Sequence, residues 1–264
     1  MNDIIRLYTR PELRSPNLVA AWPGICNVSL LAASYLEKKI NFEKLGEIEA
    51  SYFFDPIGVV VKNNVVESPQ FPQNKFYYWK NDSGGSDIIL FIGEDQPPAK
   101  GYELANCILN LAQDFQVKRI YTLAAALTRI HPTEQPEVWG AVNNQQLIDV
   151  LREHDLLHRG NLQIAGLNGL LLGVAKEKGI EGICLLGEVP AYTDRLPNPI
   201  AALAILKVLT RMLEIEIDTS ELAQMAQETK EKMQQMTAEA MGEYIDLFTE
   251  PIWEKEEDEE DEED

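Results

Sequence analysis

Cysteine is scarce in this sequence. Only Cys26, Cys107 and Cys184 occur among 264 residues, and no two of them are closely spaced. This spacing gives no sign of a disulfide framework or of a cysteine-based zinc site. The first residues, MNDIIRLYTRPEL, lack the basic region and the long apolar stretch of a secretory signal peptide. We therefore expect the protein to work in the reducing cytoplasm.

Long apolar runs and positive charge are also lacking. No uninterrupted apolar stretch approaches the ~20 residues that cross a bilayer. The 23 Lys and Arg are outnumbered by 43 Asp and Glu, and of the net charge of −20 the segment EKEEDEEDEED, residues 254–264, contributes −9. Because this field repels polyanions, we expect no nucleic acid and no membrane surface as a partner. Residues 251–264 are expected to form a disordered acidic tail, since they bury too little apolar area to offset the cost of ordering.

Strand-like and helix-like segments alternate along most of the chain. Buried strands are predicted at residues 17–22, 87–94, 117–127, 161–166 and 180–188, with helical spacing of apolar residues between several of them. The segment GVVVKNNVVES, residues 58–68, belongs to a stretch that reads as consecutive strands or a hairpin. Repeated crossovers require parallel strands with helices on both faces. The sequence therefore predicts an α/β fold, a three-layer α/β/α core domain with a mostly parallel sheet over residues 1–215.

The sequence changes character after this core. Residues 218–248 have the pattern of an amphipathic helix or a helix pair, within a helical extension expected over residues 216–250. One stripe of this extension carries Met225, Met233 and Met236, and methionine adapts to irregular apolar surfaces. The stripe is expected to pack on the core or on a partner subunit, and the pattern leaves both possibilities open.

Three glycines, Gly166, Gly169 and Gly173, raise the question of a phosphate-binding loop. A dinucleotide fingerprint beginning at Gly166 needs glycine where the chain has Asn168 and Leu171, and Gly-Lys-Ser/Thr occurs nowhere. No cofactor is expected. We interpret the glycines as a tight strand-to-helix turn, with Gly173 allowing close approach of helix and sheet, and keep an anion site at the helix start as the weaker alternative.

The segment HDLLH resembles a two-histidine zinc helix, with His154 and His158 four residues apart. Asp155 stands where that motif has glutamate, so we expect these histidines to interact with a helix C-terminus and expect no metal. His131 has no Gly-x-Ser-x-Gly partner motif, and a nucleophilic triad is therefore not expected.

Two predicted strands end alike, in Gly-Glu followed by proline a few residues on, which places Glu94 and Glu188 at strand ends. Ligands of open parallel sheets bind beyond the carboxyl ends of the strands, so one hypothesis gives these glutamates paired acid/base roles. Asn168 and Tyr192 would then be polar residues of the same pocket. The competing interpretation is that each glutamate caps a local backbone segment.

Several blocks, in order, resemble the proteasome assembly chaperone 2 (PAC2) family: AWPGICNVSLLAASYLEKK, LGEIEASYFFD, DIILFIGEDQPP, VWGAVNN and IAGLNGLLLGVAKEKGIEGICLLGE. The likeness extends over about residues 17 to 235. It implies a nucleoside-phosphorylase-like core with C-terminal helices, self-association into a homo-oligomer, and proteasome α-subunits as partners if the host has a proteasome. The final residues, DEEDEED, depart from the hydrophobic-Tyr-x docking signal of such chaperones. A non-enzymatic oligomeric binding protein is the favoured hypothesis, and a small-molecule hydrolase or phosphorylase-like enzyme using Glu94 and Glu188 is the alternative.

Overall fold

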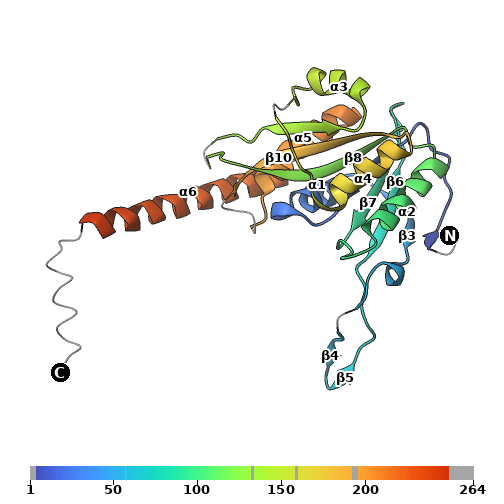
Figure 1. Cartoon of the computed structure of the whole chain (residues 1–264), viewed down its shortest axis with the longest axis horizontal. Coiled ribbons are helices and arrows are strands. Elements are labelled where there is room, and N and C mark those ends of the chain that lie inside the picture. The colour runs from blue at the N-terminus through green and yellow to red at the C-terminus, as the bar shows by residue number, and fades with distance from the viewer. Residues whose placement is uncertain (1–3, 57, 132–133, 158–159, 192–195, 250–264) are drawn as a thin grey trace.

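The computed structural model describes residues 4–56, 58–131, 134–157, 160–191 and 196–249. A central sheet is covered by helices on both faces, and one long helix and one hairpin project away from this body (Figure 1). This arrangement confirms the expected three-layer α/β/α fold. No helix within the described ranges has the length and apolarity needed to cross a membrane.

The described residues form an eight-stranded sheet in the order β1-β3-β6-β7-β2-β8-β10-β9. Its strands are β1 (Ile5–Leu7), β2 (Asn17–Ala21), β3 (Glu43–Ile48), β6 (Asn74–Trp79), β7 (Ile88–Gly93), β8 (Arg119–Thr128), β9 (Val138–Val142) and β10 (Glu181–Pro190). The four central strands, β7, β2, β8 and β10, run parallel. The outer strands pair antiparallel, so the sheet is mixed, and β3 shares the direction of the central four.

The helices divide between the two faces of the sheet. They are α1 (Val28–Lys39), α2 (Gly101–Asp114), α3 (Ile148–Glu153), α4 (Gly166–Glu177), α5 (Pro199–Leu213) and α6 (Ser220–Thr249). Helices α1 and α5 pack on one face, together with α3 and the start of α6, whereas α2 and α4 pack on the other. Two separate apolar cores therefore sandwich the sheet.

The alternation of side chains in β7 explains why its sequence is apolar throughout. Ile88 and Leu90 point into the core beneath α1 and α5, while Ile89 and Phe91 point into the core beneath α2 and α4. All four are fully buried. Successive strand side chains face opposite sides of a sheet, and a strand covered on both sides has no polar face.

Two details of the predicted core are wrong. Residues 161–165 are not a strand; they form an irregular segment that enters α4. Gly173 does not permit close contact with the sheet, because a Cβ built there would meet no atom within 4 Å. The tight glycines are the other two. Gly166 has a φ of +71°, and a Cβ on Gly169 would lie 2.1 Å from the Ile164 carbonyl oxygen.

The C-terminal extension is one continuous helix, α6, whose far half leaves the body of the molecule (Figure 1). A two-stranded hairpin, β4 (Val61–Lys62) and β5 (Val65–Val66), projects in another direction; of the two predicted arrangements, consecutive strands or a hairpin, residues 58–68 form the hairpin. The acidic tail, 251–264, lies outside the described residues.

Candidate interaction surfaces

Glu94 and Glu188, the two glutamates predicted at strand ends, make equivalent hydrogen bonds in two different parts of the sheet. The Glu94 backbone N–H donates to the Gln73 carbonyl, 2.9 Å, and Glu94 Oε2 accepts from the Gln73 N–H, 2.8 Å. Glu188 repeats this with Glu137, with distances of 3.1 and 2.9 Å. Each carboxylate therefore extends the pairing of its strand with an antiparallel neighbour by one further hydrogen bond.

The glycines that precede these glutamates have packing causes. A Cβ on Gly93 would lie 2.5 Å from the Trp22 indole, and a Cβ on Gly187 would lie 3.1 Å from the Ala201 carbonyl oxygen. The first glycine leaves room for Trp22 and the second for α5. The repeated Gly-Glu is thus accounted for by close packing followed by backbone capping.

The structure does not bring Glu94 and Glu188 into one pocket. Glu94 follows β7, but Glu188 lies inside β10, which runs on to Pro190, so the expected strand end at Glu188 is wrong. The two strands are separated by β2 and β8 and lie about 14 Å apart at the usual spacing. Each carboxylate also bonds toward its outer neighbour and away from the other. A general acid and base must both reach the reacting group, and this pair lacks that geometry.

The remaining predicted pocket residues are also separated from the glutamates. Asn168 is 3% exposed in the first turn of α4 and lines a cavity beside Ser29, which neither glutamate lines. Tyr192 lies outside the described residues, as does His158. The His154 carbonyl accepts from Arg211 Nη2 just after α3 ends.

Neither Cys107 nor Cys184 is suited to nucleophilic chemistry. Burial raises the pKa of the Cys107 thiol to about 11 and that of the Cys184 thiol to about 12. The thiolate is the nucleophile, so both thiols are unreactive near neutral pH. Within the described ranges no three His, Cys, Asp or Glu side chains gather as a metal site.

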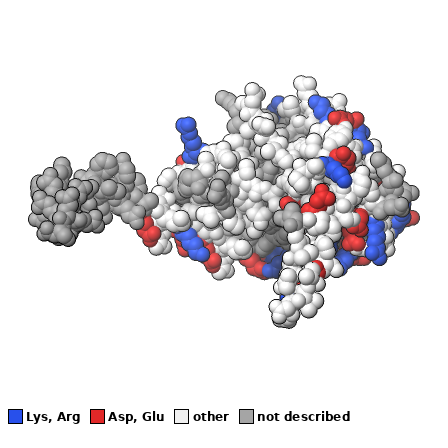
Figure 2. Space-filling model, turned by 60° about the horizontal axis from the view of Figure 1, so that its bottom comes forward, with Lys and Arg blue, Asp and Glu red and all other residues white. Residues whose placement is uncertain are grey.

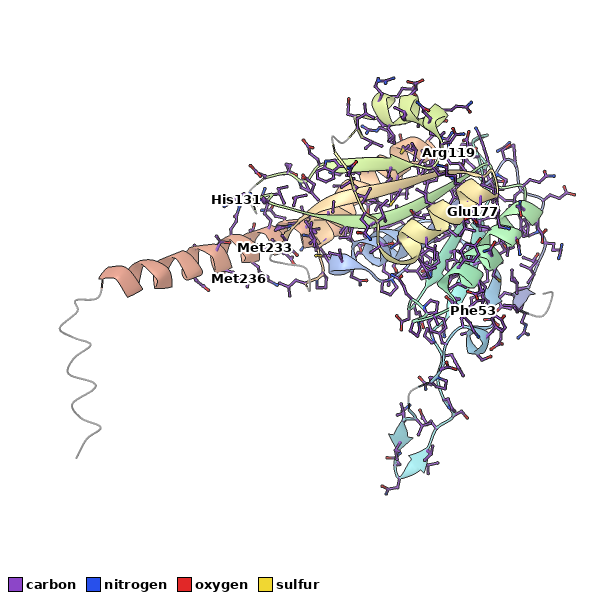
Figure 3. The ribbon with its side chains drawn as sticks, in the orientation of Figure 1. Phe53, Arg119, His131, Glu177, Met233 and Met236 are labelled. Atoms are coloured by element: carbon purple, nitrogen blue, oxygen red, sulfur yellow. The ribbon has the colours of Figure 1, made fainter. Side chains whose placement is uncertain are left out.

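Three methionines of α6 have described side chains, and these three fall into two groups. Met225 is 47% exposed and Met236 is 58% exposed, whereas Met233 is 8% exposed. Met233 closes a small depression lined by His131 and Glu188, and Figure 3 shows it beside His131, with Met236 further along the helix. Met233 is thus an internal contact of α6, while the other two methionines are free for a partner.

Exposed apolar side chains are concentrated on the arm, which we define as residues 58–67 around β4 and β5. Its five valines are between 47% and 67% exposed: Val59, Val60, Val61, Val65 and Val66. The arm stands clear of the body, and Figure 2 shows it as a largely uncharged projection. An isolated two-stranded hairpin is only marginally stable in water, so the arm has the properties of a segment stabilised by contact. The sequence predicts the hairpin, but the valine pattern does not reveal that both faces are exposed.

A groove of about 500 Å³ lies at the foot of the arm, between β1 and α2. Ile5, Leu7 and Phe53 form part of its apolar lining, and Arg10, Glu103 and Asp114 are its charged residues. The edge strand β1 pairs only on its β3 side within the described chain. Groove and edge together offer apolar contacts and unused backbone hydrogen-bonding groups, the combination that accepts an added strand.

Known proteins share this architecture. Pyrococcus furiosus PbaB, described as an archaeal proteasome activator, is 31% identical, with a TM-score of 0.75 over 88% of this chain and 98% of that one. Pyrococcus furiosus PbaA, described as an archaeal homolog of proteasome-assembly chaperone, is 25% identical, with a TM-score of 0.67 over 88% of this chain and 96% of that one.

Sequence comparison gives a consistent result. The uncharacterized protein MJ1210 of Methanocaldococcus jannaschii is 31% identical over 235 residues, which cover 86% of each chain. The PAC2 family model matches residues 18–237, which include the sheet apart from β1 and the first residue of β2, and most of α6. The chain therefore belongs to the PAC2 family.

Proposed function

We propose that this protein is a non-enzymatic, homo-oligomeric binding protein of the cytoplasm that engages the proteasome or its subunits. The observation that carries the proposal is the similarity to PbaB, which extends over 98% of that chain at 31% identity. PbaB is described as a proteasome activator and PbaA as a homolog of an assembly chaperone. Both roles depend on contact between protein surfaces.

The strand ends support a binding role over an enzymatic one. The two carboxylates nominated for acid/base chemistry are engaged with the backbone of different strands. Exposed apolar side chains include the five valines of the arm and, on α6, Met225 and Met236. Exposed apolar surface set among polar residues is typical of protein-binding sites.

Self-association is assigned to the arm and the groove. The arm presents five valines, and the groove of a second copy offers apolar side chains beside the free edge of β1. Because arm and groove are different surfaces of one chain, the contact is heterologous. Repeated heterologous contacts form a ring when the rotation between neighbours closes and a filament when it does not. The proposed assembly is the closed ring of arm-in-groove contacts.

Partner binding is assigned to the exposed side of α6, with Met225 and Met236. Met225 and Met236 are both exposed, and neither belongs to the arm, so both remain available when the arm is engaged. Separate surfaces for the two contacts make them separable by mutation.

The test compares three variants by light scattering and by co-elution with purified proteasome α-subunits of the same host. The double variant Val61→Ser with Val66→Ser is expected to lose the oligomer mass. Met236→Asp is expected to keep that mass and to lose co-elution. Leu157→Ser changes an apolar residue that is 50% exposed elsewhere and serves as the control for both. A monomeric wild-type protein would refute the ring, and wild-type protein that never co-elutes with the subunits would refute the partner.

A further inference from the structure

One part of the sheet has no buried residues on the side of α1 and α5. Among the described residues, the buried strand residues of the core beneath these helices come from β2, β7, β8, β9 and β10, and none comes from β1, β3 or β6. The same β3 and β6 contribute buried residues to the opposite core, beneath α2 and α4. Antiparallel strands can expose one face in this way. We call the α1 side of β1, β3 and β6 the bare face.

Three aromatic side chains stand on the bare face: Tyr8, Tyr77 and Trp79. Tyr77 pairs with Leu90 and Trp79 pairs with Ile88, whose side chains point toward α1, so both aromatic residues lie on that side of the sheet. None of the three is buried, and Tyr8 is 47% exposed. Tyrosine and tryptophan provide large contact areas and are enriched at protein interfaces.

The carboxylates beside these aromatic residues already have partners in the chain. Glu47 Oε1 lies 3.8 Å from Arg6 Nη1, and a hydrogen bond with Glu47 raises the pKa of the Tyr8 hydroxyl. Burial, and then the Glu37 carboxylate on α1, raise the pKa of Tyr77 to about 12. The negative charge at this surface is therefore already engaged.

Two lysines of the bare face have no such partner. Lys44 pairs with Tyr77, and Lys75 is two residues away from Tyr77 on the same strand, so the two lysines are diagonal neighbours on one face, about 7–8 Å apart. Glu47 stands opposite Lys75, but its carboxylate is engaged by Arg6. Within the described chain neither lysine forms an ion pair. The uncompensated charge is positive, and its complement is an acidic segment that carries an apolar residue.

The chain itself contains such a segment. Residues 251–264 read PIWEKEEDEEDEED, an isoleucine and a tryptophan followed by a run of carboxylates. The same copy is badly placed to supply it, because the 30-residue helix α6 is about 45 Å long and extends away from β3 and β6 (Figure 1). Residues 250–264 span at most about 50 Å when fully extended, so at best their last residues return to the start of α6. A second copy has no such restriction.

We propose that the bare face binds the acidic tail, residues 251–264, of a second copy of this chain. Lys44 and Lys75 bind carboxylates of the tail, and the aromatic side chains contact its apolar beginning. This contact goes beyond the arm-in-groove contact and does not depend on it, since the groove lies on the other side of the sheet, beside α2.

The test uses an equal mixture of isotope-labelled and unlabelled full-length protein, treated with a water-soluble carbodiimide. The reagent joins an ammonium to a contacting carboxylate as an amide, and mass spectrometry identifies the linked peptides. Links from Lys44 and Lys75 to residues 254–264 are expected, and pairs of one labelled and one unlabelled peptide should be as abundant as all unmixed pairs together. Lys118, an exposed lysine just before β8, is the internal control and should link to the tail far less.

A fluorescent peptide with the sequence of residues 251–264 measures the affinity for the full-length protein by anisotropy. Lys44→Glu with Lys75→Glu is expected to weaken binding by about tenfold or more, and added salt should weaken the wild-type binding because the contact is between charges. Lys118→Glu with Lys176→Glu changes the net charge equally at two exposed lysines elsewhere, so it is the matched control and should bind like the wild type. The peptide with Gln and Asn in place of Glu and Asp should not bind.

Each alternative result overturns a stated part of the proposal. Unmixed pairs alone would place the tail on its own copy. Equal linking of Lys118, or equal loss of affinity in both double variants, would remove the bare face as the site. An unrelated peptide of the same charge that binds as tightly would overturn the assignment to this tail, and a tail peptide that does not bind would remove the proposal. The links should persist in Val61→Ser with Val66→Ser, so failure of the tail contact is distinguishable from failure of the arm contact.

Discussion

Lys39 Nζ lies 2.8 Å from Glu221 Oε1, and the same ammonium lies 3.1 Å from Asp218 Oδ2. These contacts join the end of α1 to the start of α6. Tyr35 adds to them, because its hydroxyl donates to the Asp218 carbonyl, 3.1 Å, and Leu222 is buried at the same junction. The first turn of α6 is thus fixed, and the direction in which the rest of the helix projects is set at this point (Figure 1).

Acid should loosen this junction. Hydrogen bonds from the Ser220 side chain and backbone, and then the Lys39 ammonium, lower the pKa of Asp218 to about 2. A carboxylate whose folded pKa is lowered stabilises the native state above its unfolded value of about 4, and this stabilisation disappears as pH falls through the folded pKa. We expect pepsin cleavage within residues 214–226 to rise, relative to cleavage in the arm, between about pH 4 and pH 2. Asp218→Asn should raise this ratio already at about pH 4, and a ratio that does not change with pH would contradict the assignment.

Glu94 and Glu188 should contribute to the free energy of unfolding independently of each other. Glu94→Ala and Glu188→Ala each leave a backbone N–H without its carboxylate partner, at a cost of about 1 kcal/mol in the free energy of unfolding. Residues this far apart act additively, so the double variant should cost the sum to within about 0.5 kcal/mol. Urea unfolding measures all three variants. Glutamine at either position keeps a hydrogen-bond acceptor and should leave the free energy of unfolding nearly unchanged. A double variant whose cost differs from the sum by much more than this would indicate that the two glutamates interact, as a shared site requires.

Alanine substitutions at Gly93 and Gly173 should change the stability of the fold in opposite directions. Gly93→Ala places a methyl group 2.5 Å from Trp22 and should destabilise the fold by about 1–3 kcal/mol. Gly173→Ala adds a methyl group where nothing lies within 4 Å and should stabilise α4 by up to about 1 kcal/mol. Thermal unfolding compares the two variants with the wild type. If both substitutions were neutral, the close approach of Trp22 to β7 would be wrong.

Alanine substitutions at Met233 and Met236 should differ in their effect on stability, because Met233 is buried and Met236 is exposed. Met233→Ala removes a buried contact of α6 and should lower the free energy of unfolding by about 2 kcal/mol. Met236→Ala changes a side chain that is 58% exposed and should stay within about 0.5 kcal/mol of the wild type. Denaturant unfolding at a protein concentration below that of self-association measures both. The reverse order of effects would place Met236 in the core.

The α/β class follows from the sequence because strands buried on both faces leave a visible signal. The runs at residues 88–93 and 182–187 carry no charged residue on either face of the sheet, and helices with one apolar stripe separate several of the strands. Direction of pairing leaves no such signal. Strand β9 is antiparallel to β10, yet its sequence does not distinguish it from a parallel strand. The direction of β9 depends on how α3 and α5 pack around it, and the local sequence of the strand does not encode that packing.

The candidate site was only partly predictable for a related reason. Glu94 stands at the end of its strand as expected, whereas Glu188 lies two residues before the end of β10. Their distance depends on strand order, which places β2 and β8 between them. Asn168 belongs to a glycine-rich segment that the sequence makes visible, whereas Ser29, which lines the same cavity, belongs to no local motif. Its environment is created by the return of α4, more than a hundred residues later in the chain.

The most direct test of the account is the mass of the full-length protein, measured by native mass spectrometry, alone and mixed with proteasome α-subunits of its host. We predict a closed oligomer alone and, in the mixture, an additional species that contains both proteins. A monomer that forms no such species would contradict the central claim that this PAC2 protein acts through its surfaces.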